Sequence, residues 1–186
     1  VVKKEFVMPT VSFSFTKSEL MLCGAVVLML LSLFMYTKGA FAYPYLEDED
    51  PWGHAVGAKY VALEKTAYDP VLKDQQRMDS VLSYIDPYPP AYDVLIGVLH
   101  QTSPDLNWTI KFFNALIISL GILFFYLFAK EFIGNSGKAL LATFFLAAIP
   151  SYLSHFIWAH GYVVTLFFPA MYALLMIKED GKWMWI

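Results

Sequence analysis

Two long stretches of this chain stand out from its polar segments because they contain no charged side chain. Residues 20–37 and residues 112–129 are uncharged and consist mostly of aliphatic and aromatic residues. Each reaches the roughly 18 residues that a helix needs to cross a bilayer. We therefore expect a transmembrane helix at each of these positions.

A third uncharged stretch is too long for one span. Residues 139–177 contain no Asp, Glu, Lys or Arg. A single helix of this length would be about 58 Å long, roughly twice the hydrocarbon thickness. Proline, serine and histidine interrupt the apolar pattern within residues 150–161. We therefore expect two spans here, at about 138–153 and 160–177.

The segment 38–111 separates the first two spans and is the largest loop. Lysines lie before the first span, in the turn between the second and third, and after the fourth: Lys3, Lys4, Lys17, Lys130, Lys138, Lys178 and Lys182. Cytoplasmic loops of membrane proteins carry such an excess of positive charge. The pattern predicts a multi-pass integral membrane protein with a cytoplasmic N-terminus and with loop 38–111 on the external face.

Composition agrees with a chain built for the lipid bilayer. Apolar residues make up 58% and charged residues 16%, against about 45–50% and about 25% in a typical soluble domain. The 13 Lys and Arg are scattered and the net charge is −3, which argues against nucleic acid as a partner. The predicted fold class is all-α, a polytopic transmembrane helical bundle. The chain begins with Val and ends in a Trp-rich run, so we expect 1–186 to be a single N-terminal transmembrane fragment.

The external loop begins with a run of acidic residues close to the end of the first span. Residues 46–54 read LEDEDPWGH, with four consecutive acids. Such carboxylates repel one another and anionic headgroups, so they need a cation or solvent. Together with His54 they suit a divalent metal such as Mg or Mn. A solvated acidic turn that caps a helix starting at Pro51 explains the same pattern, and both interpretations stay open.

The rest of this loop predicts two helices and a rigid turn. Val56, Tyr60 and Leu63 follow helical spacing and form an apolar stripe suited to lying on the membrane or on the spans. Residues 71–85 are polar with spaced apolar positions, typical of a second exposed helix. Residues 86–92 (DPYPPAY) contain three prolines, which favour an extended turn. This turn could wall a substrate groove or only connect the chain to the second span.

Three of these segments resemble a known family. The acidic motif at 48–54 is similar to the Asp-x-Asp-Pro-aromatic motif of oligosaccharyltransferase catalytic subunits of the STT3 and AglB type. The Tyr-Pro-Pro-x-Tyr segment at 88–92 and the short turn at 149–155, with its proline, tyrosine and serine, resemble parts of the same family. The resemblance covers roughly residues 18–178. It implies the GT-C fold of membrane glycosyltransferases.

The resemblance also implies a function and a set of site residues. It implies transfer of a sugar or oligosaccharide from a polyprenyl-phosphate-linked donor to an acceptor protein at the outer membrane face, with a divalent metal (Mg or Mn) as cofactor. Asp50 matches the family residue that contacts both the metal and the acceptor, and Asp48 is a weaker candidate metal ligand. A cation beside a lipid phosphate would neutralise charge on the leaving group, while a carboxylate would orient the nucleophile.

The chain departs from the family at its second acidic motif. The corresponding segment, residues 158–165 (WAHGYVVT), contains no acid. Histidine can bind a metal or pair with a phosphate, so we predict His160 as a metal ligand in place of the missing acid. Four further residues are predicted to bind substrate: His54, His155, Tyr88 and Tyr92. Histidines at a membrane interface also serve as plain hydrogen-bonding groups.

A non-catalytic polytopic membrane protein, such as a transporter segment or scaffold, is the alternative to a glycosyltransferase. Transporters place ionisable residues near the middle of the bilayer. The four predicted spans contain no acidic residue, and the acids gather next to the first span instead. The sequence therefore favours the enzyme.

Overall fold

All regular secondary structure in the described part of this chain is helical. In the computed structural model these residues are 14–66, 89–149, 152 and 159–177. They form α1 (Lys17–Ala40), α2 (Glu49–Glu64), α4 (Ala91–His100), α5 (Leu106–Ile133), α6 (Ser136–Ala148) and α8 (His160–Met176), with no strand in these ranges. The all-α prediction is confirmed. The helix expected at 71–85 lies outside the described residues.

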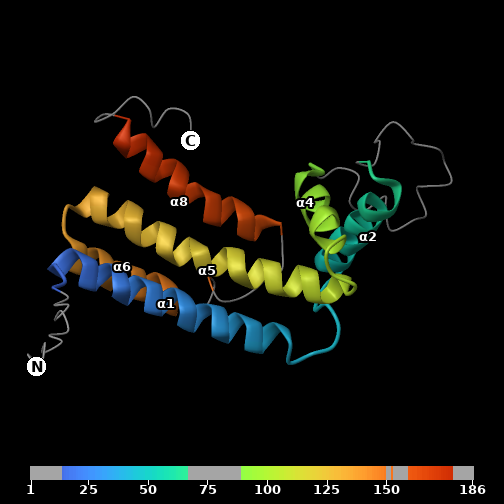
Figure 1. The fold of residues 1–186 in the computed structure, drawn as a ribbon, viewed down its shortest axis with the longest axis horizontal. Coiled ribbons are helices and arrows are strands. Elements are labelled where there is room, and N and C mark those ends of the chain that lie inside the picture. Colours follow the sequence, from blue (N-terminus) through green and yellow to red (C-terminus); the bar gives the residue numbers. More distant parts are fainter. Residues whose placement is uncertain (1–13, 67–88, 150–151, 153–158, 178–186) are drawn as a thin grey trace, which may run out of the picture.

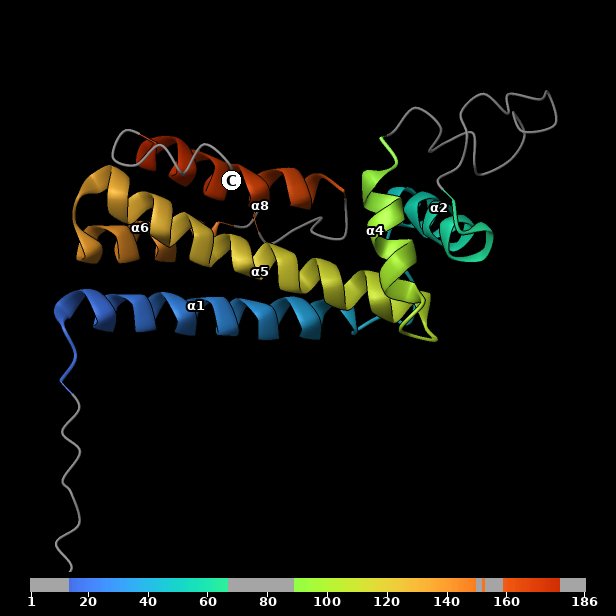
Figure 2. The ribbon, with the colours of Figure 1, turned by 45° about the horizontal axis from the view of Figure 1, so that its top comes forward.

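Helix α5 is the centre of a bundle that also contains α1, α6 and α8 (Figures 1 and 2). Helices α1 and α6 run in one direction along the bundle, and α5 and α8 run in the other (Figure 1). The shorter helices α2 and α4 pack against each other at the end of the bundle where α1 ends and α5 and α8 begin. The end of α1, the helices α2 and α4 and the starts of α5 and α8 therefore lie at one end of the bundle.

Side-chain caps fix where the central helices begin and end. The Asp105 carboxylate accepts a hydrogen bond from the Trp108 amide at 3.1 Å and caps the N-terminus of α5. At the other end, Gly134 takes the left-handed conformation (φ 68°), which glycine adopts without a steric penalty. The Asn135 side chain then accepts hydrogen bonds from two amides of α6. Helix α5 is thus longer than the predicted span 112–129, because the caps lie outside its uncharged centre.

The prediction of four membrane spans is confirmed in part. By length and composition, α1 and α5 could cross a membrane, with 24 and 28 residues. Helices α6 and α8 are apolar but shorter, with 13 and 17 residues. The predicted break between them is confirmed, because α6 ends at Ala148, just before Pro150, and α8 begins at His160.

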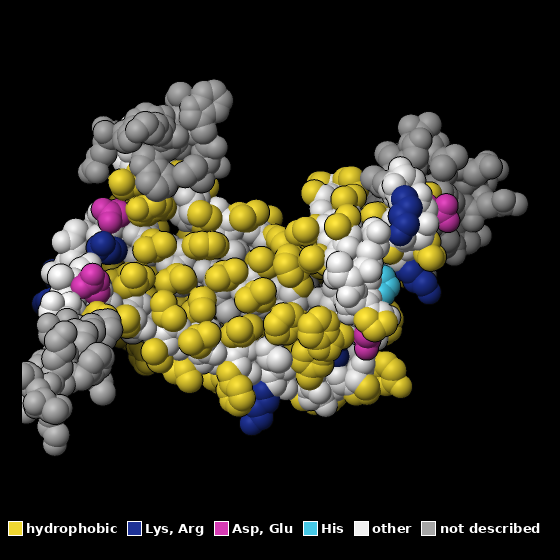
Figure 3. Space-filling model, viewed as in Figure 1, with side chains coloured by type: hydrophobic (Ala, Val, Ile, Leu, Met, Phe, Trp, Pro, Cys, Tyr) yellow, Lys and Arg dark blue, Asp and Glu magenta, His cyan; other side chains and the backbone are white. Residues whose placement is uncertain are grey.

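Large apolar side chains remain exposed along the outside of the bundle (Figure 3). A helix in water normally presents a polar outer face, whereas here only 17% of the apolar window of α1 is buried within the protein. The exposed residues on the bundle helices include Leu22, Val27, Leu30, Leu31, Phe34, Met35, Leu141, Phe144, Phe145, Val163, Leu166, Phe167 and Leu174. This surface is what a lipid-facing bundle requires.

Helices α2 and α4 approach closely through small residues. A Cβ atom on Gly97 of α4 would lie 2.6 Å from the Ala58 carbonyl oxygen of α2 and 2.8 Å from the Val61 Cβ. The buried face of α2 contains Gly57, Ala58 and Val61. The predicted stripe is not this face, since Leu63 is 67% exposed and Val56 and Tyr60 are only partly buried. The close contact with α4 uses small residues instead, and a position of the stripe on the membrane stays a prediction.

Replacing Gly97 by alanine should loosen the α2–α4 contact. The added methyl group would press on backbone, which has little room to move, so we expect Gly97→Ala to lower the free energy of unfolding by about 1–3 kcal/mol. Unfolding in detergent would measure this, and hydrogen exchange should locate the loosened amides in α2 and α4. Gly39→Ala is the matched control, because nothing lies within 4 Å of its Cβ position. Equal stability of both variants would contradict the close contact.

Candidate functional site

The acidic run forms the start of α2, directly after the connection from α1. Asp48 is the N-cap, and its Oδ1 accepts a hydrogen bond from the Glu49 amide at 2.7 Å. The helix begins at Glu49, two residues before Pro51. The capping interpretation is therefore confirmed for Asp48. Asp50 differs from its neighbours because it is partly buried, whereas Glu47, Asp48 and Glu49 are exposed.

A buried lysine joins this connection to α5. Lys111 is only 2% exposed, and its Nζ donates a hydrogen bond to the Tyr43 carbonyl oxygen at 2.6 Å. The same ammonium lies 5.7 Å from the centre of the Phe41 ring. Glu47 and Asp105 are close enough to interact with it electrostatically. A buried cation requires such partners, so Lys111 fixes the acidic segment against the start of α5.

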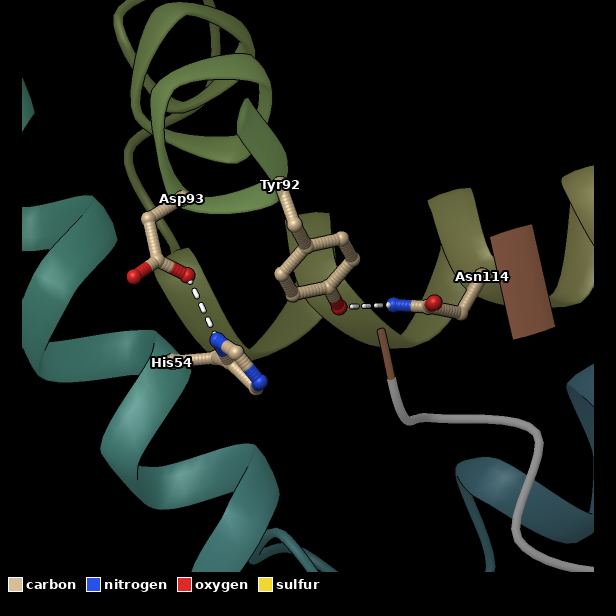
Figure 4. A network of polar contacts seen from close by, with 4 residues as sticks. All are labelled: His54, Tyr92, Asp93 and Asn114. Carbon is tan, nitrogen blue, oxygen red and sulfur yellow. Dashed lines mark hydrogen bonds and ion pairs between the residues drawn. The ribbon is translucent and has the colours of Figure 1, made fainter. Parts of the chain in front are cut away.

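A histidine–aspartate pair holds α2 against α4 (Figure 4). His54 Nδ1 lies 2.6 Å from Asp93 Oδ1, and the two residues are 4% and 1% exposed. His54 is one helical turn after Asp50, so both residues lie on one face of α2. Sequence reasoning missed Asp93, because a single acid in a short apolar helix gives no signal of its partner.

Burial changes the pKa of the Asp93 carboxyl group more strongly than the interaction with His54 does. Removal from water raises the pKa of Asp93 above its ordinary value of 3.8, while the hydrogen bond and the charge of His54 lower it. The second carboxylate oxygen, Oδ2, has no hydrogen-bond partner in the described part of the chain. The pair is therefore a buried polar contact with unused hydrogen-bonding capacity.

Tyr92 connects the same two helices to the bundle (Figure 4). Its hydroxyl group accepts a hydrogen bond from Asn114 Nδ2 of α5 at 2.7 Å, and its ring packs edge-on against His54 and against Tyr162 of α8. Burial raises the pKa of Tyr92, which keeps its hydroxyl group protonated. The prediction that Tyr92 belongs to an extended turn is wrong. It lies in the first turn of α4, because Pro90 is the N-cap and proline is tolerated there.

The predicted metal ligands do not gather into one cluster. Asp48 and Asp50 lie at the start of α2, and His160 is the exposed first residue of α8 at the same end of the bundle. Within the described ranges, no three His, Cys, Asp or Glu side chains are placed to hold a metal ion. His155 and Tyr88 lie outside those ranges.

The chemistry of Asp50 and its neighbours nevertheless fits Mg²⁺ in part. This ion commonly takes only one or two carboxylates from the protein and completes its coordination with water and substrate phosphates. Asp50 and Asp48 could supply those carboxylates. A role for His160 as a ligand stays a prediction.

Comparisons with known proteins give no family for this chain. No protein-family model, curated protein or solved structure matches it.

Removing the Asp93 carboxylate should delete the buried hydrogen bond between the Asp93 and His54 side chains. We expect Asp93→Ala to lower the free energy of unfolding by about 1–3 kcal/mol, the contribution of a buried hydrogen bond that involves a charged group. Asp93→Asn keeps an oxygen that can accept from His54 and should retain most of this stability. Chemical unfolding in detergent measures both variants. An alanine variant as stable as the wild type would show that the pair contributes nothing.

The same pair predicts a pH dependence with a defined sign. Because the pKa of Asp93 is raised on folding, its contribution to stability is complete below pH 3.8 and is lost as the pH rises through the folded-state pKa. Wild type should therefore gain stability relative to Asp93→Asn as the pH falls from neutral. Unfolding measured for both proteins across this range tests the sign, and a difference that does not change with pH contradicts it.

Proposed function

We propose that this chain is the N-terminal part of a membrane glycosyltransferase of the oligosaccharyltransferase type. The reaction is transfer of a sugar or oligosaccharide from a polyprenyl-phosphate-linked donor to an acceptor protein at the external face. The bundle spans the membrane, with α1, α5, α6 and α8 as the four spans and with the N-terminus in the cytoplasm.

The placement of Asp50 carries this proposal. Asp50 is the partly buried residue of an otherwise exposed acidic run. The His54–Asp93 contact, one turn further along α2, fixes the rotation of this helix. Asp50 therefore lies on the face of α2 that carries His54, at the end of an apolar bundle where a lipid-anchored donor could reach it. A carboxylate that only solvates a loop needs no such constraint.

In this proposal each residue has a simple task. Asp50 orients the acceptor amide and contributes a carboxylate to a Mg²⁺ or Mn²⁺ site, with Asp48 as a weaker ligand. The metal supplies charge neutralisation at the donor phosphate. His54 and Asp93 hold α2, and Lys111 fixes the segment that precedes it. His160 stands at the start of α8 at the same end and is the proposed replacement for the family's second acid.

A non-catalytic membrane protein, a transporter segment or scaffold, is the second candidate. One observation favours it: the Asp48 carboxylate caps α2, which gives this acid a structural task without any metal. The two candidates differ in what they require of Asp50, since only the enzyme needs its carboxylate.

Substitution of Asp50 separates the two candidates. In the intact, detergent-solubilised protein we expect saturable Mn²⁺ binding that Asp50→Ala abolishes and His160→Ala weakens. Transfer from a lipid-linked sugar donor to an acceptor peptide should fall at least about 100-fold in Asp50→Ala, as expected when a group that stabilises the transition state is lost. Glu49→Ala is the matched control, because this exposed neighbour should tolerate the change. Absence of saturable metal binding in the wild type would reject the metal-dependent enzyme and favour the scaffold.

A further inference from the structure

One side of α4 is apolar and exposed. Helix α4 contacts α2 through the Asp93 carboxylate and the narrow space at Gly97. Ala91, Leu95 and Val98 follow one another at intervals of four and three residues, so they lie on the side of this helix that faces away from α2. All three are exposed, with Leu95 at 38% and Val98 at 53%. We call these three residues the α4 stripe.

The α4 stripe differs from the outer face of an ordinary surface helix. A helix in water normally presents charged or polar side chains on its outer face. The side chains beside the stripe, Val94 and Leu99, are also apolar and are partly exposed. The one acid of this helix, Asp93, is turned inward to His54. The exposed side of α4 therefore offers no side chain that water would hydrate strongly.

The position of α4 turns this stripe toward the level of the bundle. Helix α4 lies across the direction of α5, and α2 lies on the side of α4 that is farther from the bundle (Figures 1 and 2). The side of α4 away from α2 therefore faces back toward the bundle. The exposed apolar side chains of α8 begin at this end, with Val163 and Val164 in its first turns. Hydrophobic side chains cover the bundle and continue onto α4 (Figure 3).

A tryptophan marks the same level of the molecule. Trp108 lies in the first turn of α5, just after the turn that joins α4 to α5, and is 46% exposed. Tryptophan in membrane proteins favours the boundary between hydrocarbon and water. In a bundle that crosses the membrane, this boundary therefore passes close to α4.

We propose that α4 is an interfacial helix and that the α4 stripe contacts the acyl chains of the lipid leaflet at this end of the bundle. An amphipathic helix in the membrane plane buries its apolar face about 5–10 Å into the boundary between headgroups and acyl chains. A protein partner would be matched by a rim of polar groups, whereas the stripe continues the apolar surface of the bundle. This contact requires a bundle that crosses the membrane, but it does not depend on the proposed transfer reaction.

The proposal assigns the membrane contact to α4 in place of the apolar stripe of α2. Leu63 of that stripe stands beside Lys59 and Glu64, and both of these charged residues are exposed. Lipid contact at Leu63 would bring these two charges toward hydrocarbon, which costs free energy. The α4 stripe carries no such cost.

Spin labels on the full chain in phosphatidylcholine nanodiscs test this contact. A Cys23→Ala background removes the native thiol, and one label at a time is attached through Leu95→Cys or Val98→Cys. Power saturation compares collisions with O₂, which dissolves in hydrocarbon, and collisions with a water-soluble nickel chelate. We expect both labels to collide more with O₂, and their accessibility to nickel to be several-fold below that of Leu63→Cys. Leu63→Cys is the matched control, because this leucine of α2 is exposed beside charged residues.

A label at Leu31→Cys, in the middle of α1, gives the reference for lipid contact. Equal nickel accessibility at Val98 and Leu63 would place α4 in water and reject the proposal. Low accessibility to both reagents would show that protein covers the stripe, which also rejects it. Nickel accessibility at Leu31 would overturn it as well, because the bundle would then not cross the membrane. An α4 in water together with a lipid-facing Leu31 rejects only this contact and leaves the spanning bundle and the proposed enzyme unaffected.

Discussion

Gly121, in the middle of α5, lets three parts of the bundle approach one point. A Cβ atom at this position would lie 2.5 Å from the Tyr152 hydroxyl oxygen and 3.1 Å from Thr165 Oγ1 of α8. Tyr152 donates from that hydroxyl to the Ile118 carbonyl oxygen at 3.1 Å, and its own carbonyl oxygen accepts from the Tyr36 hydroxyl of α1 at 3.1 Å. The absence of a side chain at Gly121 therefore permits contacts that join α1, α5 and α8. Helices without water between them associate through such small residues and hydrogen bonds.

Hydrogen bonds from the N-terminal part of α5 also join the bundle to the helices that carry the candidate site. Asn114 reaches Tyr92 of α4, and Lys111 reaches the segment that precedes α2. Both are nearly fully buried on an apolar helix, where an unpaired polar group costs more free energy than it does in water. These contacts favour one arrangement of the loop over others. A few polar side chains hold α2 and α4 against the bundle, and close packing at Gly97 holds the two helices against each other.

The sequence predicted the parts of the fold that depend on local pattern. The uncharged stretches located the long helices, Pro150 marked the end of α6, and the acids before Pro51 indicated the start of α2. It did not predict that Asp93 pairs with His54 or that Tyr92 is buried against Asn114. These contacts join residues of different helices, and neither charge nor periodicity records which pairs meet. The face of α2 that packs on α4 was not predicted either, because its burial follows the narrow space beside Gly97 rather than side-chain hydrophobicity.

The helix that carries Asp50 is held in place by His54 and Asp93, which have no chemical role in the proposed reaction. Residues four apart in a helix lie on one face, so Asp50 shares the face of α2 on which His54 contacts Asp93 of α4. Asp48 and Glu49 remain exposed, one as a cap and the other in the first turn. Four adjacent acids with similar side chains thus differ in exposure, and the partly buried one shares a helix face with the buried pair. A carboxylate on a helix that a neighbouring helix holds in place needs less ordering when a substrate binds, because folding has already supplied part of that free energy.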